Sequence, residues 1–243
     1  MKTQIMIGAL ALAVSQMATA AGPGHGGGHH QAGVEITGNS TQDTSAGASL
    51  IYNHSFGDRT EATQSISSNV SEINIGGTSV QNSLLLGASV ANVSVGGDAV
   101  QNISSNADKV DVKNGATSTQ TTNILFSGVE NIAKGEDSYA TQNMSSNFGN
   151  VEIGRISNQT TNLLPGSSVK NESIGSLSFA AQNLSTNFGK VTIDGVSNQT
   201  TTATFSNVVN LATGYKSAAR QSLSTNSSCQ VDQTCTGLRY RGH

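Results

Sequence analysis

A segment of the form Ala-x-Gln-(Asn)-x-Ser-(Ser/Thr)-Asn returns five times in this chain. Its glutamines lie 37, 41, 40 and 39 residues apart, and each precedes an asparagine by five positions. The five pairs are Gln64/Asn69, Gln101/Asn106, Gln142/Asn147, Gln182/Asn187 and Gln221/Asn226. A unit of this length that cannot bury its own apolar face must stack on copies of itself. Stacking therefore constrains the fold more than any other feature.

A second motif fixes the register inside each unit. Two β-branched residues stand two positions apart, a glycine follows, and a glutamine comes eight residues after the first of them. The copies are Ile73/Ile75/Gly77/Gln81, Val151/Ile153/Gly154/Gln159 and Val191/Ile193/Gly195/Gln199. The copy Val110/Val112/Gln120 carries two extra residues, which we expect to form a loop, and a further copy, from Val34 to Gln42, precedes the first full unit.

The local pattern predicts strands throughout. Apolar and polar residues alternate with a period of two, and Asn-Phe-Gly or Gly-Gly interrupts the run every six to ten residues. Pro165-Gly166 predicts a turn. We expect an all-β chain that forms a repeat β-solenoid or stacked β-arches, with cross-β order on assembly.

The sequence predicts four regions. Lys2, the apolar stretch Ile5–Val14 and Ala18-Thr19-Ala20 are typical of a secretory signal. The predicted regions are a signal peptide (1–20), a Gly/His-rich leader (21–33), the repeat domain (34–226) and a tail with a cysteine pair (227–243). The repeat domain divides into a half unit (34–61), full units (62–98, 99–139, 140–179 and 180–218) and a half unit (219–226). No stretch is long enough for a membrane span.

The two half units allow two interpretations. They can be degenerate caps, as in many solenoids. Alternatively, the trailing half of one subunit and the leading half of the next complete one rung, a head-to-tail contact that never closes and so builds a filament.

Stacked amides favour the filament. If one unit forms one rung, equivalent glutamines and asparagines lie about 4.8 Å apart, and each amide can donate to one copy and accept from another. The alternative, polar surface or turn positions, explains poorly why the pairs keep one spacing. The predicted ladder for self-assembly comprises Gln64, Asn69, Gln81, Gln101, Asn106, Gln120, Gln142, Asn147, Gln159, Gln182, Asn187, Gln199, Gln221 and Asn226.

Composition argues against an enzyme. Charged residues are 11% of the chain, against roughly 25% in an ordinary globular protein, and tryptophan is absent. The sequence contains no basic stripe of the kind that would predict nucleic-acid binding. Acids recur between the β-branched residues only as Glu35, Asp111 and Glu152, where alternation turns them outward to solvent. We therefore expect neither catalytic residues nor a cofactor.

Together these motifs resemble bacterial functional amyloids. Curli subunits share the Gln-x4-Asn spacing, and the repeat length of about forty is more similar to Fap-type amyloid subunits. The resemblance covers residues 34–235 and implies β-arch or Greek-key layers, export through an outer-membrane pore, a related amyloid subunit as partner, and biofilm fibres at the cell surface. The family has a C-terminal Cys-x-x-Cys, whereas five residues separate Cys229 from Cys235 here. The repeats also lack long linkers, which favours a minor or nucleating subunit.

Two features of the predicted tails leave alternatives open. Cys229 and Cys235 are the only cysteines, and an exported pair commonly forms a disulfide. Redox control during export and an intermolecular link are the alternatives. His25, His29 and His30 lie in a glycine-rich leader, which we interpret as flexible rather than as a metal site.

The sequence thus predicts a secreted subunit, passing through the periplasm, that self-assembles into extracellular amyloid fibres. The main alternative is a monomeric β-solenoid adhesin that binds surfaces through flat faces such as Gln199–Thr202. A metal or haem scavenger that uses the histidine leader is a third class.

Overall fold

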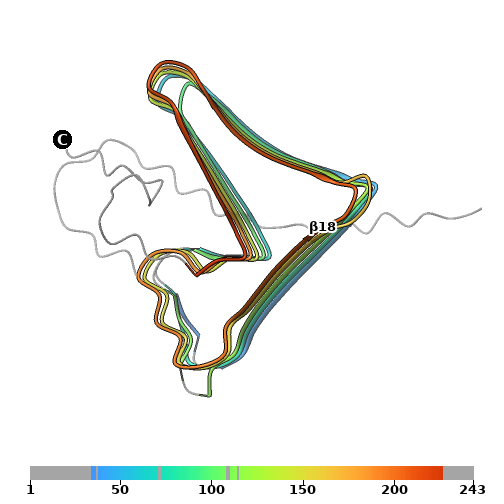
Figure 1. The fold of residues 1–243 in the computed structure, drawn as a ribbon, viewed down its shortest axis with the longest axis vertical. Coiled ribbons are helices and arrows are strands. Elements are labelled where there is room, and N and C mark those ends of the chain that lie inside the picture. Colours follow the sequence, from blue (N-terminus) through green and yellow to red (C-terminus); the bar gives the residue numbers. More distant parts are fainter. Residues whose placement is uncertain (1–33, 37, 71–72, 108–109, 114, 227–243) are drawn as a thin grey trace, which may run out of the picture. The chain divides into compact units, whose positions relative to one another are not determined.

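The repeat region folds into parallel strands stacked layer upon layer. The computed structural model describes residues 34–36, 38–70, 73–107, 110–113 and 115–226. These residues contain strands and turns but no helix, which confirms the all-β β-solenoid fold. In Figure 1 the successive turns of the repeat lie over one another. The predicted signal peptide, the leader and the cysteine tail lie outside the described residues.

Three five-stranded parallel sheets form the walls of the solenoid. Sheet 1 contains β2 (Ser40–Gly47), β7 (Ser79–Leu86), β12 (Ser118–Leu125), β15 (Asn158–Leu163) and β18 (Asn198–Ala203). Sheet 2 contains β3 (Leu50–Phe56), β8 (Ser89–Val95), β13 (Gly128–Lys134), β16 (Ser168–Ile174) and β19 (Asn207–Thr213). Sheet 3 contains β4 (Glu61–Ile66), β9 (Asp98–Ile103), β14 (Tyr139–Met144), β17 (Phe179–Leu184) and β20 (Ala218–Leu223).

Two narrower strips complete each layer. The V-x-I strip contains β1 (Val34–Ile36), β6 (Ile73–Ile75) and β11 (Val110–Asp111), and continues as single bridges from Asp111 to Glu152 and from Glu152 to Thr192. The asparagine strip contains β5 (Asn69–Val70) and β10 (Asn106–Ala107), and continues as single bridges through Asn147, Asn187 and Asn226. The V-x-I motif and the Gln-x4-Asn motif thus occupy different parts of one layer.

One repeat forms one layer. Equivalent residues pair in register from layer to layer, as Gln101 does with Gln64 and Gln142 with Gln101. Counted from the V-x-I strip, layers 1 to 5 comprise residues 34–70, 73–107, 110–150, 151–190 and 191–226. The predicted half units 34–61 and 219–226 are parts of layer 1 and layer 5. Each end of the described solenoid is therefore a whole layer.

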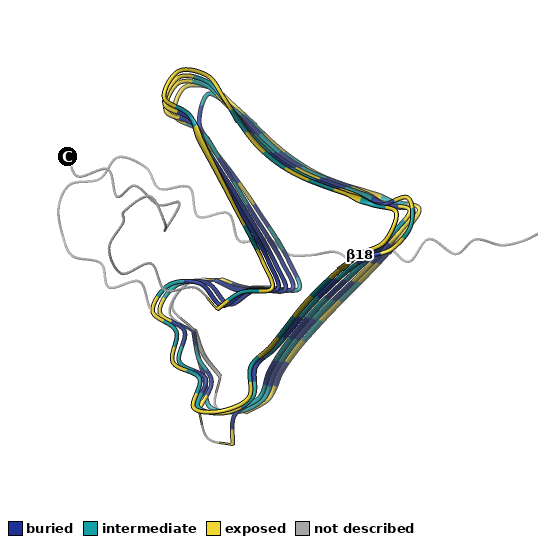
Figure 2. Cartoon of the chain, viewed as in Figure 1, coloured by how far each residue is buried: buried dark blue, intermediate teal, exposed yellow. Residues whose placement is uncertain are grey.

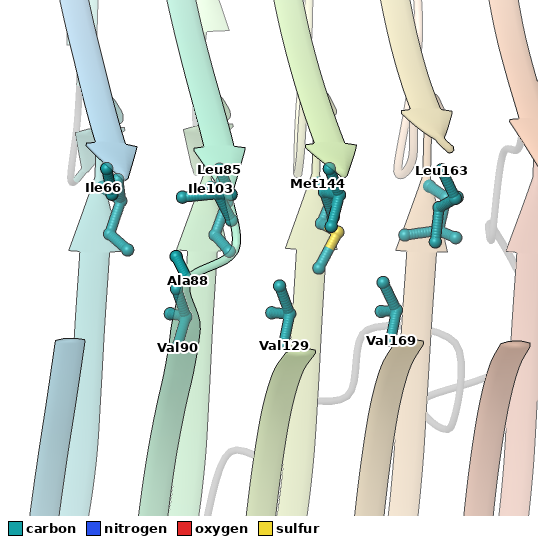
Figure 3. Close-up of a cluster of buried hydrophobic side chains, with 12 residues drawn as sticks. Ile66, Leu85, Ala88, Val90, Ile103, Val129, Met144, Leu163 and Val169 are labelled. Carbon is teal, nitrogen blue, oxygen red and sulfur yellow. The ribbon is translucent and has the colours of Figure 1, made fainter. Parts of the chain in front are cut away.

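The apolar core is a set of rows that run along the stack. Its main cluster joins the ends of the strands of sheets 1 and 3 to the start of sheet 2. Figure 3 shows Ile66, Ile103 and Met144 side by side in one row, from left to right, above a second row that includes Val129 and Val169 of sheet 2. In Figure 2 bands of buried residues alternate with bands of half-buried and exposed residues along the sheet that contains β18. A smaller cluster around Ile75 and Ile153 fills the V-x-I strip.

The predicted interruptions also have structural counterparts. Lys113 and residues 115–117, where the third V-x-I copy has its two extra residues, lie outside the strands. Pro165 and Gly166 form the predicted turn between β15 and β16.

A column of glycines lets the layers approach one another at the corner between sheets 2 and 3. The column comprises Gly57, Gly96, Gly135, Gly175 and Gly214, all with positive φ. A Cβ added to Gly175 would lie 1.7 Å from the carbonyl oxygen of Gly135 in the layer below. Only glycine fits this corner, because a side chain would force adjacent layers apart.

Gly175→Ala should therefore lower the free energy of unfolding by about 3 kcal/mol or more, since it combines an unfavourable φ with a backbone clash. Urea denaturation of the purified repeat domain measures the change. Gly128→Ala is the matched control, because a Cβ there meets nothing within 4 Å. Equal stability of the two variants would contradict close packing at the corner.

Candidate functional site: the amide ladders and the end layers

The predicted glutamines of sheet 3 form a continuous ladder of side-chain amides. Gln101 donates to Gln64 at 2.8 Å, Gln142 to Gln101 at 2.8 Å, and Gln182 to Gln142 at 2.7 Å. Gln221 continues the series by donating to Gln182. Most members also donate to a backbone carbonyl of sheet 2, as Gln101 does to Glu130. The ladder therefore ties sheet 3 to sheet 2 as well as layer to layer.

Sheet 2 carries a second ladder that the sequence analysis missed. Its members are Asn53, Asn92, Asn131, Asn171 and Asn210, linked by amide bonds of 2.7 to 2.8 Å. Asn131 is fully buried and also donates to the carbonyls of Ala99 and Thr141 in sheet 3. The sequence does carry a signal, because these asparagines recur at intervals of 39, 39, 40 and 39 residues.

The asparagine strip forms a third ladder. Asn69 donates to Asn106 at 2.8 Å, and the series continues through Asn147 and Asn187 to Asn226. The first four of these amides also donate to a serine hydroxyl that begins or precedes a strand of sheet 1, as Asn106 does to Ser118. The asparagine of the Gln-x4-Asn motif therefore joins sheet 1 to the end of sheet 3.

A fourth ladder runs through the glutamines of sheet 1. Gln120 donates to Gln81 at 2.9 Å, Gln159 to Gln120 at 3.0 Å, and Gln199 to Gln159 at 3.1 Å. Gln42 occupies the same register in layer 1 but does not join this ladder. Its amide nitrogen donates instead to Asn69 Oδ1. The structure thus places every predicted ladder residue in a stack along the solenoid.

The ladders have a direction. Both glutamine ladders donate toward layer 1, whereas the ladders that start at Asn53 and Asn69 donate toward layer 5. Layer 5 therefore ends in the acceptor oxygens of Gln199 and Gln221 and in the donor nitrogen of Asn226. Layer 1 ends in the complementary groups, the amide nitrogen of Gln64 and the side-chain oxygens of Asn53 and Asn69.

Buried polar atoms without a partner gather in the two end layers. Among the described residues five such side-chain atoms occur, and four of them belong to layers 1 and 5. The five residues are Gln42, Ser49, Asp111, Ser206 and Thr225. The inner counterparts of Thr225 are bonded: Ser105 donates to Ile103 and Asn143, and Ser146 to Met144 and Asn183. An unpaired buried polar group costs roughly 1 to 3 kcal/mol, so the end layers are the costly part of the fold.

The two ends differ in exposure. In layer 5, Gln221 and Asn226 are exposed, although their neighbours Gln182 and Asn187 are completely buried. In layer 1, the inward side chains of β2 and β3 are mostly half-buried, but Gln64 on β4 is buried. At both ends of the stack the sheets also end in edge strands. Such strands carry unpaired backbone groups that can template further strands.

Asp111 and Glu152 lie on the outer face, as the alternation predicts, whereas the side chain of Glu35 lies outside what the structure describes. Lys113 contacts Glu152 at 2.6 Å and Asp111 at 3.8 Å. All three side chains are at least one-third exposed, and the hydrogen bond with Glu152 raises the pKa of Lys113 above its ordinary value. These ion pairs are surface contacts of small energetic weight.

Other kinds of site find no support in the part of the chain that the structure describes. No group of three or more His, Cys, Asp or Glu side chains there could hold a metal ion. The same residues include no helix of the length and apolarity needed to cross a membrane. His25, His29, His30, Cys229 and Cys235 lie outside the described residues, so the metal, flexible-leader and disulfide hypotheses stay predictions.

In comparisons with protein family models, with curated proteins and with solved structures, nothing matches this chain. The geometry of the ladders and of the end layers is therefore the basis for a functional proposal.

Asn131→Ala should lower the free energy of unfolding by about 3 kcal/mol, because the amides of Asn92 and Asn171 and two backbone carbonyls lose a buried partner. Asn162→Ala is the control, since its bond to Asn123 lies on the half-buried outer face, and should cost about 1 kcal/mol or less. Thermal and urea unfolding measure both. A loss for Asn131→Ala no larger than the control would contradict the role of the second ladder.

Proposed function

We propose that this protein is a structural subunit that self-assembles head to tail into cross-β fibres. The observation that carries the proposal is the concentration of unpartnered buried polar atoms in layers 1 and 5. A second copy placed on either end supplies the hydrogen-bond partners that an inner layer receives from its neighbouring layers. Assembly then repeats the contact that holds each layer to the next.

The direction of the strands selects a head-to-tail contact. All strand pairs are parallel, so a second copy in the same orientation extends each sheet without a change in pairing. In that arrangement Gln64 of the second copy can donate to Gln221, and Asn210 can donate to Asn53 of the second copy. A copy turned end over end would pair its strands antiparallel and set like amide groups against each other. Because both ends stay usable after each addition, the assembly is an open filament.

The charges of the two end layers are complementary. Layer 1 holds Glu35, Asp43, Asp58, Glu61 and one base, a net charge of −3. Layer 5 holds Asp194, Lys216 and Arg220, a net charge of +1. Opposite charges attract the ends before contact and repel two copies of the same end.

The outer face of sheet 2 is also apolar at its two ends. Leu50, Tyr52 and Phe56 on β3 are 70%, 57% and 79% exposed, and Val209 and Leu211 on β19 are about two-fifths exposed. Extension of the register places Val209 beside Tyr52 of the second copy. On the same face layers 3 and 4 carry Glu130, Lys134, Lys170 and Glu172, whereas β8 of layer 2 carries Ala91, Val93 and Val95. Contact between the ends therefore joins the exposed apolar residues of two copies.

The proposal also includes a cellular setting, which rests on features of the sequence. The signal-like N-terminus and the resemblance to Fap-type subunits support export through an outer-membrane pore and assembly, with a related subunit, into fibres of a biofilm matrix at the cell surface. The short connections between layers support a minor or nucleating subunit. The composition supports a structural rather than a catalytic role.

The adhesin alternative is favoured by one face of the molecule. The outer positions of sheet 1 align Thr121, Thr160 and Thr200 in one row, with Asn123, Asn162 and Thr202 in the next. Such regular polar rows offer a flat surface for a repetitive ligand. A stable monomer that still adheres to surfaces would support this function instead.

Fibre diffraction tests the main proposal. The purified repeat domain should give fibres with a meridional reflection near 4.8 Å, the spacing between paired strands. A protein that stays monomeric by sedimentation after long incubation, without this reflection, would refute fibre formation.

A charge on the stacking face of layer 5 should block assembly. Ala219 lies inward on β20 and is exposed, whereas its counterpart Ala180 in the layer below is completely buried. Ala219→Lys leaves the monomer folded but would bury an unpaired charge in the fibre, so the rate of seeded elongation should fall by more than a factor of ten.

Thr200→Lys is the matched control for this variant. It adds the same charge to the same layer, but on an exposed outer position. It should elongate within a factor of about three of the wild type. Equal elongation by Ala219→Lys and the wild type would rule out stacking through this face.

A further inference from the structure

We propose that Gln42 closes the layer-1 end of the free subunit and exchanges its hydrogen-bond partner when layer 5 of a second copy arrives. The inference rests on the proposed head-to-tail assembly and adds a control step to it. It concerns Gln42, Asn69 and Gln81, which lie together where sheet 1 meets the asparagine strip.

Gln42 does not take part in the glutamine ladder of sheet 1, which joins its four counterparts. Gln120, Gln159 and Gln199 donate to the glutamine of the preceding layer. Gln81, like these three, donates to the serine two residues before it, here Ser79. Although Gln42 precedes Gln81 in register, no described hydrogen bond joins the two glutamines. The ladder therefore breaks between layers 1 and 2, and nowhere else in sheet 1.

The break follows from the direction in which Gln42 turns. Its amide nitrogen donates to Asn69 Oδ1. In the asparagine ladder the same oxygen of Asn106, Asn147 and Asn187 accepts from the preceding layer. Gln42 Nε2 and Asn69 Oδ1 are thus the donor and the acceptor that have no preceding layer among the described residues. Their bond pairs these two groups with each other.

This bond leaves another group unsatisfied. Gln42 Oε1 is buried and has no hydrogen-bond partner. Its counterparts Gln81 Oε1, Gln120 Oε1 and Gln159 Oε1 each accept from the next layer. The Gln42–Asn69 bond therefore satisfies the layer-1 end only in part, because Gln42 Oε1 is left without a partner.

A second copy offers a better set of bonds. Asn226 of that copy can donate to Asn69 Oδ1, since Asn226 Nδ2 is the free end of the asparagine ladder. Gln199 Oε1 of that copy can accept from Gln42, and Gln42 Oε1 can then accept from Gln81. One hydrogen bond breaks and three form. The free subunit must break the Gln42–Asn69 bond first, so this bond slows addition although the final contact is stronger.

Gln42→Ala separates these two effects. The variant removes the bond that must break, so seeded elongation should become about threefold faster or more. It also removes two bonds of the finished contact, so the critical concentration for assembly should rise about tenfold, the factor that a free-energy difference of ~1.4 kcal/mol produces.

Gln64→Ala is the matched control in the same layer. Gln64 already has the orientation of the other sheet-3 glutamines, because its oxygen accepts from Gln101, and so it has no bond to exchange. This variant should raise the critical concentration without any gain in elongation rate. Circular dichroism and sedimentation of both variants check that the monomers fold.

A direct measurement on the wild-type protein keeps the test independent of folding in the variants. Magnetic resonance with labelled glutamine and asparagine side-chain amides should detect the contact between Gln42 Nε2 and the Asn69 side chain in the monomer. The contact should be lost in fibres, where Gln42 contacts Gln81 instead.

Two results would overturn the exchange. One is elongation by Gln42→Ala that is as slow as elongation by Gln64→Ala; the other is a Gln42–Asn69 contact that persists in fibres. Either would leave head-to-tail assembly intact, because both presuppose fibres. Failure of the wild-type protein to form cross-β fibres would instead remove the proposed function, and the exchange with it.

Discussion

The structure depends on one constraint: each buried side-chain amide needs a copy of itself in the next layer. A layer buries glutamines and asparagines beside its short apolar rows, and these amides are satisfied along the stack. The cost of an unpaired amide therefore falls on the ends and stays the same whatever the number of layers. Inner layers are stable because both neighbours are present.

The same constraint explains the unusual composition. Serine, alanine and glycine allow the sheets and corners to approach closely, as the glycine column with Gly135 and Gly175 does. Few large side chains are needed, because each apolar residue packs against its own equivalents along a row, as Ile103 and Met144 do (Figure 3). A chain built in this way has little need for charge, and what charge it carries lies on the outer faces.

The proposed function follows from the direction of the ladders. Within each ladder all hydrogen bonds run one way, although the glutamine and asparagine ladders run in opposite directions, and this gives the two ends complementary groups. In the proposed assembly the surface that recognises a second copy is therefore the cross-section of the fold itself. In this view the apolar outer residues of β3 and β19 and the opposite charges of the end layers strengthen a contact whose register the backbone already defines.

Much of the fold and part of the site could be predicted from the sequence. The period of two gave the strands, and the spacing of Gln64, Asn69 and Gln81 gave three of the four ladders. The ladder through Asn131 was not predicted, because asparagine is frequent throughout this chain. The sequence of a single strand does not reveal which of its asparagines face the opposite sheet. The break in the ladder between Gln42 and Gln81 was not predicted either, since the sequence context of Gln42 is similar to that of its counterparts.

The sequence by itself thus determined the repeat, the strands and the residue types that stack, because periodicity and side-chain chemistry are local properties. Only the tertiary structure decided that one repeat makes one layer, that the ladders run in opposite directions, and that Gln42 turns to Asn69. These properties depend on which neighbour each amide has in space. At the end of a stack that neighbour is missing, and no residue in the sequence marks its absence.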